Sequence, residues 1–205
     1  MKQLFLCSYF AGVKEFFRQY ASEKQLGKQI LFIPTAGNVE EYRGYIDEAL
    51  QTFADLGFQV EILDISACDR ETAQAKIFQS KLLYISGGNT FYLLQELKKK
   101  QLLSLIKEQI ADGMVYVGES AGAIITAKDI DYNKIMDDKT FAMELNDTEA
   151  LNEVVFYVLP HVGEEPFVES AQATLDTYND QLNLLPLNNR QALLVEGEEV
   201  KVLEE

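Results

Sequence analysis

Short apolar runs alternate with longer segments of helical periodicity through the first 120 residues of the chain. Five runs rich in β-branched and aromatic residues, each bounded by Gly, Pro or Ser, predict strands at 3–9, 28–34, 58–65, 81–86 and 114–119. The segments between them repeat apolar residues every three or four positions and predict helices at 13–24, 38–57, 68–80 and 89–113. This alternation predicts right-handed βαβ units, and so a mainly parallel sheet with helices on both faces.

The pattern changes after about residue 128. Residues 129–153 are polar and acidic with scattered apolar positions, which predicts a long loop or a lid-like excursion. An apolar run at 154–160 then predicts a strand, 165–181 a helix, and 183–189, 191–197 and 199–204 closing strands. We find no internal repeat and no linker composition, so we expect a single α/β domain over 1–205.

Composition narrows the classes of function. The apolar share of 47% and the charged share of 25% are those of a globular protein. A net charge of -15 argues against nucleic acid and anionic membranes, because binding phosphates requires clustered Lys or Arg. Only Lys98, Lys99 and Lys100 cluster, and they suit the solvated end of a helix.

Two cysteines, Cys7 and Cys68, lie in or near apolar segments and are expected to be free thiols in a reducing compartment. No apolar run reaches the roughly 20 residues that a membrane-spanning helix needs. We therefore expect a soluble, cytoplasmic protein. The sequence leaves the oligomeric state open.

The sequence Gly118-Glu119-Ser120-Ala121-Gly122 stands between a predicted strand and a predicted helix. This G-x-S-x-G pattern is typical of a sharp turn that exposes the serine oxygen at the end of a sheet. The N–H group of the residue after the serine then points to where an oxyanion would form. The alternative is a structural glycine-rich turn, and we favour a nucleophile because strand and helix flank the motif.

A serine nucleophile needs a base, and His161 is the one histidine of the chain. It follows the strand at 154–160, so Pro160 ends the strand and presents His161 at the rim of the sheet. Taken alone, His161 is an ordinary surface or core residue. Together with Ser120 it is the expected general base.

Gly87 and Gly88 precede a predicted helix that starts near Asn89 or Thr90. Their unobstructed N–H groups suit the second half of an oxyanion hole, whereas the two glycines taken alone favour a simple turn before a helix capped by Asn89 or Thr90. Neither phosphate-binding glycine motif is present in the sequence.

The third member of a triad is expected to be a carboxylate that orients the imidazole. The residue pattern does not choose among six acidic residues, which are Asp129, Asp131, Asp137, Glu164, Glu165 and Glu196. One histidine and two distant cysteines make no ligand spacing for a metal, and we expect no cofactor.

Three segments, SGGNTFYLL, GESAGAII and LPHVGEE, resemble in order and spacing the peptidase E (aspartyl dipeptidase) family of serine peptidases, which includes the cyanophycinases. The segment FIPTAGN fits too, so the resemblance covers most of the chain. It implies a fold like that of the class I glutamine amidotransferases, which is flavodoxin-like with a nucleophile elbow, and a Ser-His-carboxylate triad.

Carried over by position, the resemblance implies Ser120 as nucleophile, His161 as base, and the amides of Gly88 and Ala121 as the oxyanion hole. It implies Glu196, followed by Gly197, as the acid, with Asp129 and Asp131 as alternatives. We prefer Glu196, because a carboxylate at a strand end is held more rigidly than one in a long loop.

The sequence departs from the resemblance where the substrate is concerned. Relatives that cleave after an N-terminal aspartate use a basic residue downstream of the histidine, and here HVGEEPFVESAQATL contains none. We expect a serine peptidase that cleaves short peptides, dipeptidase-like, without assured Asp-Xaa specificity. The alternatives are an esterase or amidase on the same machinery, or a non-catalytic binding module that retains the fold.

Overall fold

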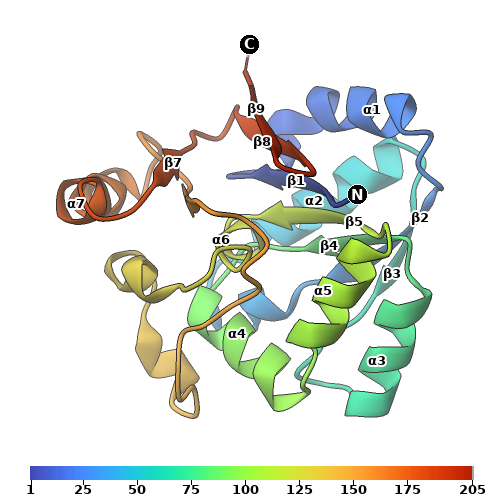
Figure 1. Cartoon of the computed structure of the whole chain (residues 1–205), viewed down its shortest axis with the longest axis horizontal. Coiled ribbons are helices and arrows are strands. Elements are labelled where there is room, and N and C mark those ends of the chain that lie inside the picture. Colours follow the sequence, from blue (N-terminus) through green and yellow to red (C-terminus); the bar gives the residue numbers. More distant parts are fainter. Residues whose placement is uncertain (205) are drawn as a thin grey trace.

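A computed structural model describes residues 1–204 and contains a seven-stranded sheet covered by helices on both faces (Figure 1). The strand order is β3-β2-β4-β5-β1-β8-β9; the first five strands are parallel, and β8 and β9 are each antiparallel to the strand before. The strands are β1 (Gln3–Cys7), β2 (Gln29–Ile33), β3 (Gln59–Ile62), β4 (Leu82–Ile85), β5 (Val115–Glu119), β8 (Ala192–Glu196) and β9 (Glu199–Leu203). The predicted mainly parallel sheet and its flavodoxin-like arrangement are confirmed.

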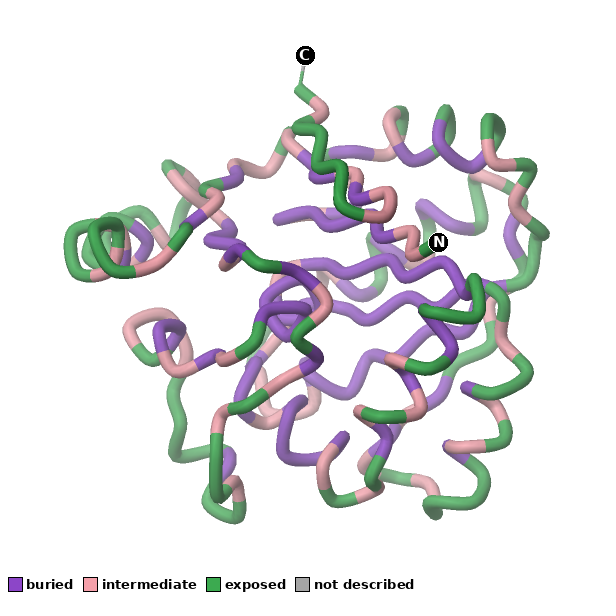
Figure 2. The backbone as a smooth tube through the Cα atoms, in the orientation of Figure 1, coloured by how far each residue is buried: buried purple, intermediate pink, exposed green. Residues whose placement is uncertain are grey.

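Successive residues of the strands face opposite sides of the sheet and so fill two apolar clusters. In β1, Leu4 and Leu6 belong to one cluster, and Phe5 and Cys7 belong to the other. Figure 2 shows these strands buried between exposed helix surfaces. The helices α1 (Lys14–Glu23) and α2 (Gly44–Asp55) cover one face, and α3 (Arg70–Gln79), α4 (Thr90–Lys99), α5 (Leu103–Ala111) and α6 (Ala121–Ile124) cover the other.

Two predicted helices have different bounds in the structure. The helix expected at 38–57 begins only at Gly44, after a short 3₁₀ helix η2 (Thr35–Val39). The helix expected at 89–113 is two helices, because Gln101 takes a left-handed conformation with φ 55° and ends the first one. The apolar pattern runs on across this break, which is why periodicity alone predicted a single helix.

The strands expected at 154–160 and 183–189 do not join the main sheet. They pair in parallel as β6 (Tyr157–Leu159) and β7 (Leu184–Pro186), with α7 (Val168–Tyr178) as the crossover between them. β8 occupies the free side of β1, so β6 and β7 form a small sheet of their own beside α6. This unit lies at the end of the molecule where the parallel strands finish, on the left in Figure 1.

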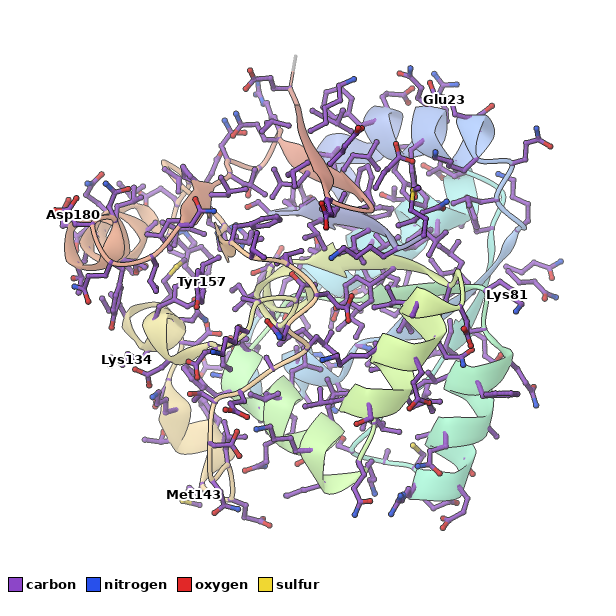
Figure 3. All side chains as sticks on the ribbon, viewed as in Figure 1. Glu23, Lys81, Lys134, Met143, Tyr157 and Asp180 are labelled. Atoms are coloured by element: carbon purple, nitrogen blue, oxygen red, sulfur yellow. The ribbon has the colours of Figure 1, made fainter. Side chains whose placement is uncertain are left out.

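The segment 129–153 lies at the same end and contains two 3₁₀ helices, η3 (Asp131–Ile135) and η4 (Lys139–Ala142); a third, η1 (Ala11–Val13), precedes α1. In Figure 3 the labelled Lys134 and Tyr157 lie on this side, and Lys81 lies on the side where the strands begin. Within residues 1–204, no helix combines the length and the apolar composition needed to cross a membrane.

Candidate active site

Ser120 lies on a sharp turn between β5 and α6. Its backbone has φ 46° and ψ -106°, a strained combination for a residue with a side chain. The two flanking glycines permit the turn: a Cβ on Gly118 would lie 2.5 Å from the Gly122 oxygen, and a Cβ on Gly122 would lie 2.1 Å from the Ile85 oxygen. The glycines of G-x-S-x-G are therefore required by close backbone packing on both sides of the serine.

His161 reaches Ser120 from the small sheet. Its Nε2 lies 3.0 Å from the Ser120 Oγ, within the distance at which a base can take the hydroxyl proton. His161 follows β6 and has a left-handed backbone with φ 60°. Its ring stacks on Phe167 with centroids 4.6 Å apart. The structure thus brings together the two residues that the sequence singled out.

The other ring nitrogen of His161 has two neutral neighbours. Nδ1 lies 2.9 Å from the Asn189 Oδ1 and 3.0 Å from the Ser8 Oγ. The Ser8 hydroxyl donates its own hydrogen to the Asn189 Oδ1 at 2.8 Å. The amide oxygen is thus the acceptor for both groups, which favours the tautomer with hydrogen on Nδ1 and a free lone pair on Nε2 facing Ser120.

Ser8 also holds the strained backbone of the histidine. The His161 N–H donates to the Ser8 Oγ at 2.8 Å. Ser8 is fully buried and follows β1, whose last residue Cys7 lies opposite Glu119 in the sheet. The Ser120 N–H donates to the Cys7 oxygen at 2.9 Å. Ser8 and Ser120 therefore emerge side by side from two adjacent parallel strands.

Burial controls the protonation of His161. Its enclosure lowers the pKa of the imidazole below the usual value, and the hydrogen bond to Asn189 and the charge of Glu164 act against that shift. The imidazole is therefore neutral at neutral pH, which is the state that a general base requires.

A second glycine loop lies directly beside the serine. A Cβ on Gly87 would lie 3.3 Å from the Ser120 Cβ. Gly88 has φ 125°, and a Cβ there would lie 2.3 Å from the Ala36 carbonyl carbon, so the position requires glycine. Neither the Gly88 N–H nor the Ala121 N–H donates to any group within residues 1–204. Two free amide donors beside a serine suit an oxyanion hole.

The sequence model that describes peptidase family S51 matches residues 6–203 of the chain. The chain belongs to peptidase family S51. An uncharacterised peptidase of Pasteurella multocida is 46% identical over 97% of this chain and 95% of its own length. An uncharacterised peptidase of Listeria monocytogenes is 41% identical over 98% of this chain and 97% of its own.

Solved structures give the same assignment to the S51 fold. The crystal structure of a candidate peptidase E protein from Listeria monocytogenes EGD-e matches with a TM-score of 0.94 at 40% identity, covering 100% of this chain and 99% of that one. A peptidase from an acI-B1 Actinobacterium shares the fold at 22% identity, with a TM-score of 0.70 over 100% of this chain and 88% of that one. This chain is a peptidase of the peptidase E type.

The prediction of Glu196 as the acid of this S51 peptidase is wrong in the structure. Glu196 lies opposite Gln3, at the beginning of β1, whereas Ser8 and the serine turn lie beyond the end of that strand. Its carboxylate forms an ion pair with Lys24. The cause is strand direction: β8 is antiparallel, so its last residue points away from the end where the parallel strands finish.

The alternative acids of the S51 peptidase are also engaged elsewhere. Asp129 accepts from Thr148 and from the Asp131 N–H, and Asp131 forms ion pairs with Lys134 and Lys139. Within residues 1–204, no carboxylate lies within hydrogen-bond distance of His161. Glu164 is linked to His161 only through Asn189: its Oε1 accepts from the Asn189 N–H at 3.3 Å, and the Asn189 side chain contacts the imidazole.

Sequence reasoning missed Ser8 and Asn189. Ser8 has a recognisable signal, because it directly follows an apolar strand at the edge where the parallel strands end. Asn189 has none, because its place depends on the antiparallel direction of β8. No group of three or more His, Cys, Asp or Glu residues that could hold a metal occurs within residues 1–204.

Proposed function

We propose that this S51 peptidase is a serine hydrolase of short peptides, with Ser120 as nucleophile and His161 as general base. Asn189 and Ser8 orient the imidazole, and the N–H groups of Gly88 and Ala121 bind the oxyanion. The observation that carries the proposal is the 3.0 Å contact between the Ser120 Oγ and the His161 Nε2, made on a strained elbow.

The chemistry follows from these positions. The Ser120 oxygen attacks the peptide carbonyl carbon while its proton moves to the His161 Nε2. The carbonyl oxygen becomes an oxyanion beside the Gly88 and Ala121 N–H groups. The C–N bond then breaks, the leaving amine takes the proton from the imidazolium, and water hydrolyses the acyl enzyme by the same proton route.

The dipeptidase-like restriction is supported by what surrounds the site. The segment 129–153 is fixed next to the glycine loop, where Asn89 Nδ2 donates to the Asp138 oxygen at 2.9 Å. The small sheet flanks the serine on the side of His161. Elements that stand beside the elbow on these sides suit a site for short peptides better than an open groove for folded proteins.

A fluorophosphonate probe tests the nucleophile. We expect stoichiometric labelling of the folded protein at Ser120, together with hydrolysis of members of a dipeptide panel, and loss of both in Ser120→Ala. Esters in the same panel separate peptidase from esterase activity. A folded protein that is neither labelled nor active on any substrate contradicts the proposal. Glu196→Gln is the matched control and is expected to keep wild-type activity, because Glu196 lies at the other end of the sheet.

A further inference from the structure

Glu119, the residue just before the serine, carries a carboxylate that the mechanism above does not use. Its side chain is almost entirely buried, with 2% of the residue exposed. It is the last residue of β5 and pairs with Cys7, the last residue of β1. It therefore lies next to the loop that follows β1 and to the loop that follows β4, the two strands on either side of β5. A buried carboxylate is costly unless its oxygens are hydrogen-bonded.

Three donors from different parts of the chain meet this carboxylate. Oε1 accepts from the Phe10 N–H at 2.7 Å. Oε2 accepts from the Tyr84 hydroxyl at 2.5 Å and from the Gly87 N–H at 3.4 Å. Because the two N–H groups can only donate, the arrangement suits an ionised carboxylate. Burial raises the pKa of Glu119, and these three donors act against the rise.

The contact with Gly87 bears on the oxyanion hole. The Gly87 N–H is held by Glu119, and the Gly87 oxygen accepts from the Ser86 hydroxyl at 3.0 Å. In a trans peptide the carbonyl and the following N–H point in opposite directions. The Ser86 hydroxyl, by holding the Gly87 oxygen, therefore sets the direction of the Gly88 N–H, one of the two proposed oxyanion donors. Glu119 holds the peptide directly before it, between Ser86 and Gly87, and so restrains the loop from which the Gly88 N–H projects.

The contact with Phe10 bears on the histidine. Phe10 stands two residues after Ser8, whose hydroxyl holds the His161 backbone and lies beside Nδ1. The Phe10 ring packs against the Tyr84 ring with centroids 5.3 Å apart. The loop that supplies Ser8 is thus fastened to the same carboxylate as the loop that supplies Gly88.

We propose that Glu119 is a positioning residue that fixes the glycine loop and the Ser8 loop relative to the elbow, and so sets the geometry of the oxyanion hole. The inference rests on the proposed serine mechanism. A structural carboxylate affects how much protein is folded, whereas a positioning carboxylate affects how tightly the folded site binds a tetrahedral species.

The test is Glu119→Gln, which keeps the shape of the side chain but loses its charge and replaces one acceptor oxygen by a donor. Active sites are counted by fluorophosphonate labelling, and kcat/KM and the inhibition constant of an aminoacyl boronic acid are measured per labelled site. Removing an oxyanion donor costs two to three orders of magnitude, so displacing one is expected to lower kcat/KM about 10- to 100-fold. The boronate should bind more weakly by a similar factor.

Glu96→Gln is the matched control, because Glu96 is also a buried carboxylate, in α4, and pairs with Lys99 away from the serine. It should leave both constants within about twofold of wild type. Glu119→Gln that folds and keeps both constants within about threefold of wild type overturns the inference. Failure of wild type to be labelled at Ser120 instead overturns the proposed function.

Tyr84→Phe provides a second, milder variant if Glu119→Gln does not fold. It removes only the hydroxyl that donates to Oε2. We expect kcat/KM and boronate binding to weaken together by about 3- to 10-fold, less than for loss of the charge itself. Wild-type constants in Tyr84→Phe, with Glu119→Gln unfolded, overturn the inference.

Discussion

The side chain next to the Nδ1 atom of His161 is the amide of Asn189, at the place where a carboxylate was expected. The Asn189 oxygen accepts from Nδ1 and from the Ser8 hydroxyl, so it orients the ring. It carries no charge to offset an imidazolium ion. The pKa of His161 is consequently governed by burial, which lowers it.

Asn189→Asp tests this interpretation. A carboxylate at this position favours the protonated imidazole and raises the pKa of His161, by about one unit or more. As pH falls, the imidazole of the variant then becomes protonated earlier, at a higher pH than in wild type. The acidic limb of kcat/KM against pH should therefore move upward. In wild type this limb lies below the usual histidine value of 6.5.

Glu164→Gln is the control, because the charge of Glu164 raises the pKa of His161. It should move the acidic limb slightly in the opposite direction. An acidic limb that stays in place in Asn189→Asp, while the variant remains folded and active, would show that Asn189 does not govern the base.

At the scale of elements, the segment 129–153 is fastened to the beginning of α4. Asp137 Oδ2 accepts from the Thr90 N–H at 2.7 Å and from Asn133 Nδ2 at 2.8 Å. Asn89 caps the helix through the Tyr92 N–H and donates to the Asp138 oxygen. Because α4 starts two residues after Gly88, this docking bears directly on the glycine loop.

Asp137 should make the stability of this docking depend on pH. Burial raises the pKa of Asp137 to about 6. Because the pKa of Asp137 is higher in the folded protein, the folded state binds its proton more tightly than the unfolded state does. Its contribution to the free energy of unfolding is therefore fully present below the unfolded pKa near 3.8 and is lost as pH rises through 6. Asp137→Asn removes this loss. In urea unfolding, its free energy of unfolding minus that of wild type should therefore rise by up to about 3 kcal/mol between pH 4 and pH 7.

Asp138→Asn is a suitable comparison, because Asp138 is exposed and its pKa is lowered. The difference between this variant and wild type should have the opposite sign of pH dependence. A constant difference between Asp137→Asn and wild type across the same range would mean that Asp137 is not perturbed in the folded protein.

Strand direction separates what the sequence could predict from what it could not. The apolar runs predicted the five parallel strands, and the rule that ligands bind where such strands end correctly grouped Ser120 with the loop of Gly87 and Gly88. His161 was reached by elimination, since the chain has one histidine. These features depend on local patterns that any parallel order of the strands would preserve.

The errors come from elements whose placement depends on distant partners. Glu196 was expected beside His161 because the resemblance implies an acid at the end of a closing strand, and the apolar pattern does not reveal that this strand, β8, is antiparallel. The apolar run at 154–160 predicted a strand but not its partner; this strand pairs with β7 in the small sheet, and β8 takes the place beside β1. Alternation of apolar residues carries no information on which neighbour a strand pairs with. The single-domain organisation and the cytoplasmic location stay predictions.

At the scale of the whole molecule, the net charge of -15 opposes acidic substrates. Arg43 is the cation that the structure places near the glycine loops: a Cβ on Gly37 would lie 2.9 Å from the Tyr45 hydroxyl and 3.7 Å from Arg43 Nε. The Tyr45 ring in turn borders Gly87. Arg43 is exposed to solvent, which makes it a weak anchor for a substrate carboxylate.

Hydrolysis of Asp-Leu, Asn-Leu and Ala-Leu at low ionic strength tests this balance. We expect no more than a modest preference for Asp-Leu, on the order of tenfold, because a buried and dedicated partner is needed for strong discrimination. Added salt should improve Asp-Leu relative to Ala-Leu by screening the negative potential. A preference of about a thousandfold that disappears in Arg43→Ala would show that Arg43 recognises the aspartate after all.

The pairing of β1 with β8 joins residues 3–7 to residues 192–196, nearly the full length of the chain apart. During synthesis, Ser120 and His161 leave the ribosome before β8 does, and Asn189 lies in the last stretch before it. The imidazole can be oriented only after this late strand has docked on the first one. A growing chain that lacks β8 therefore holds Ser120 and His161 without the Asn189 contact that orients the imidazole.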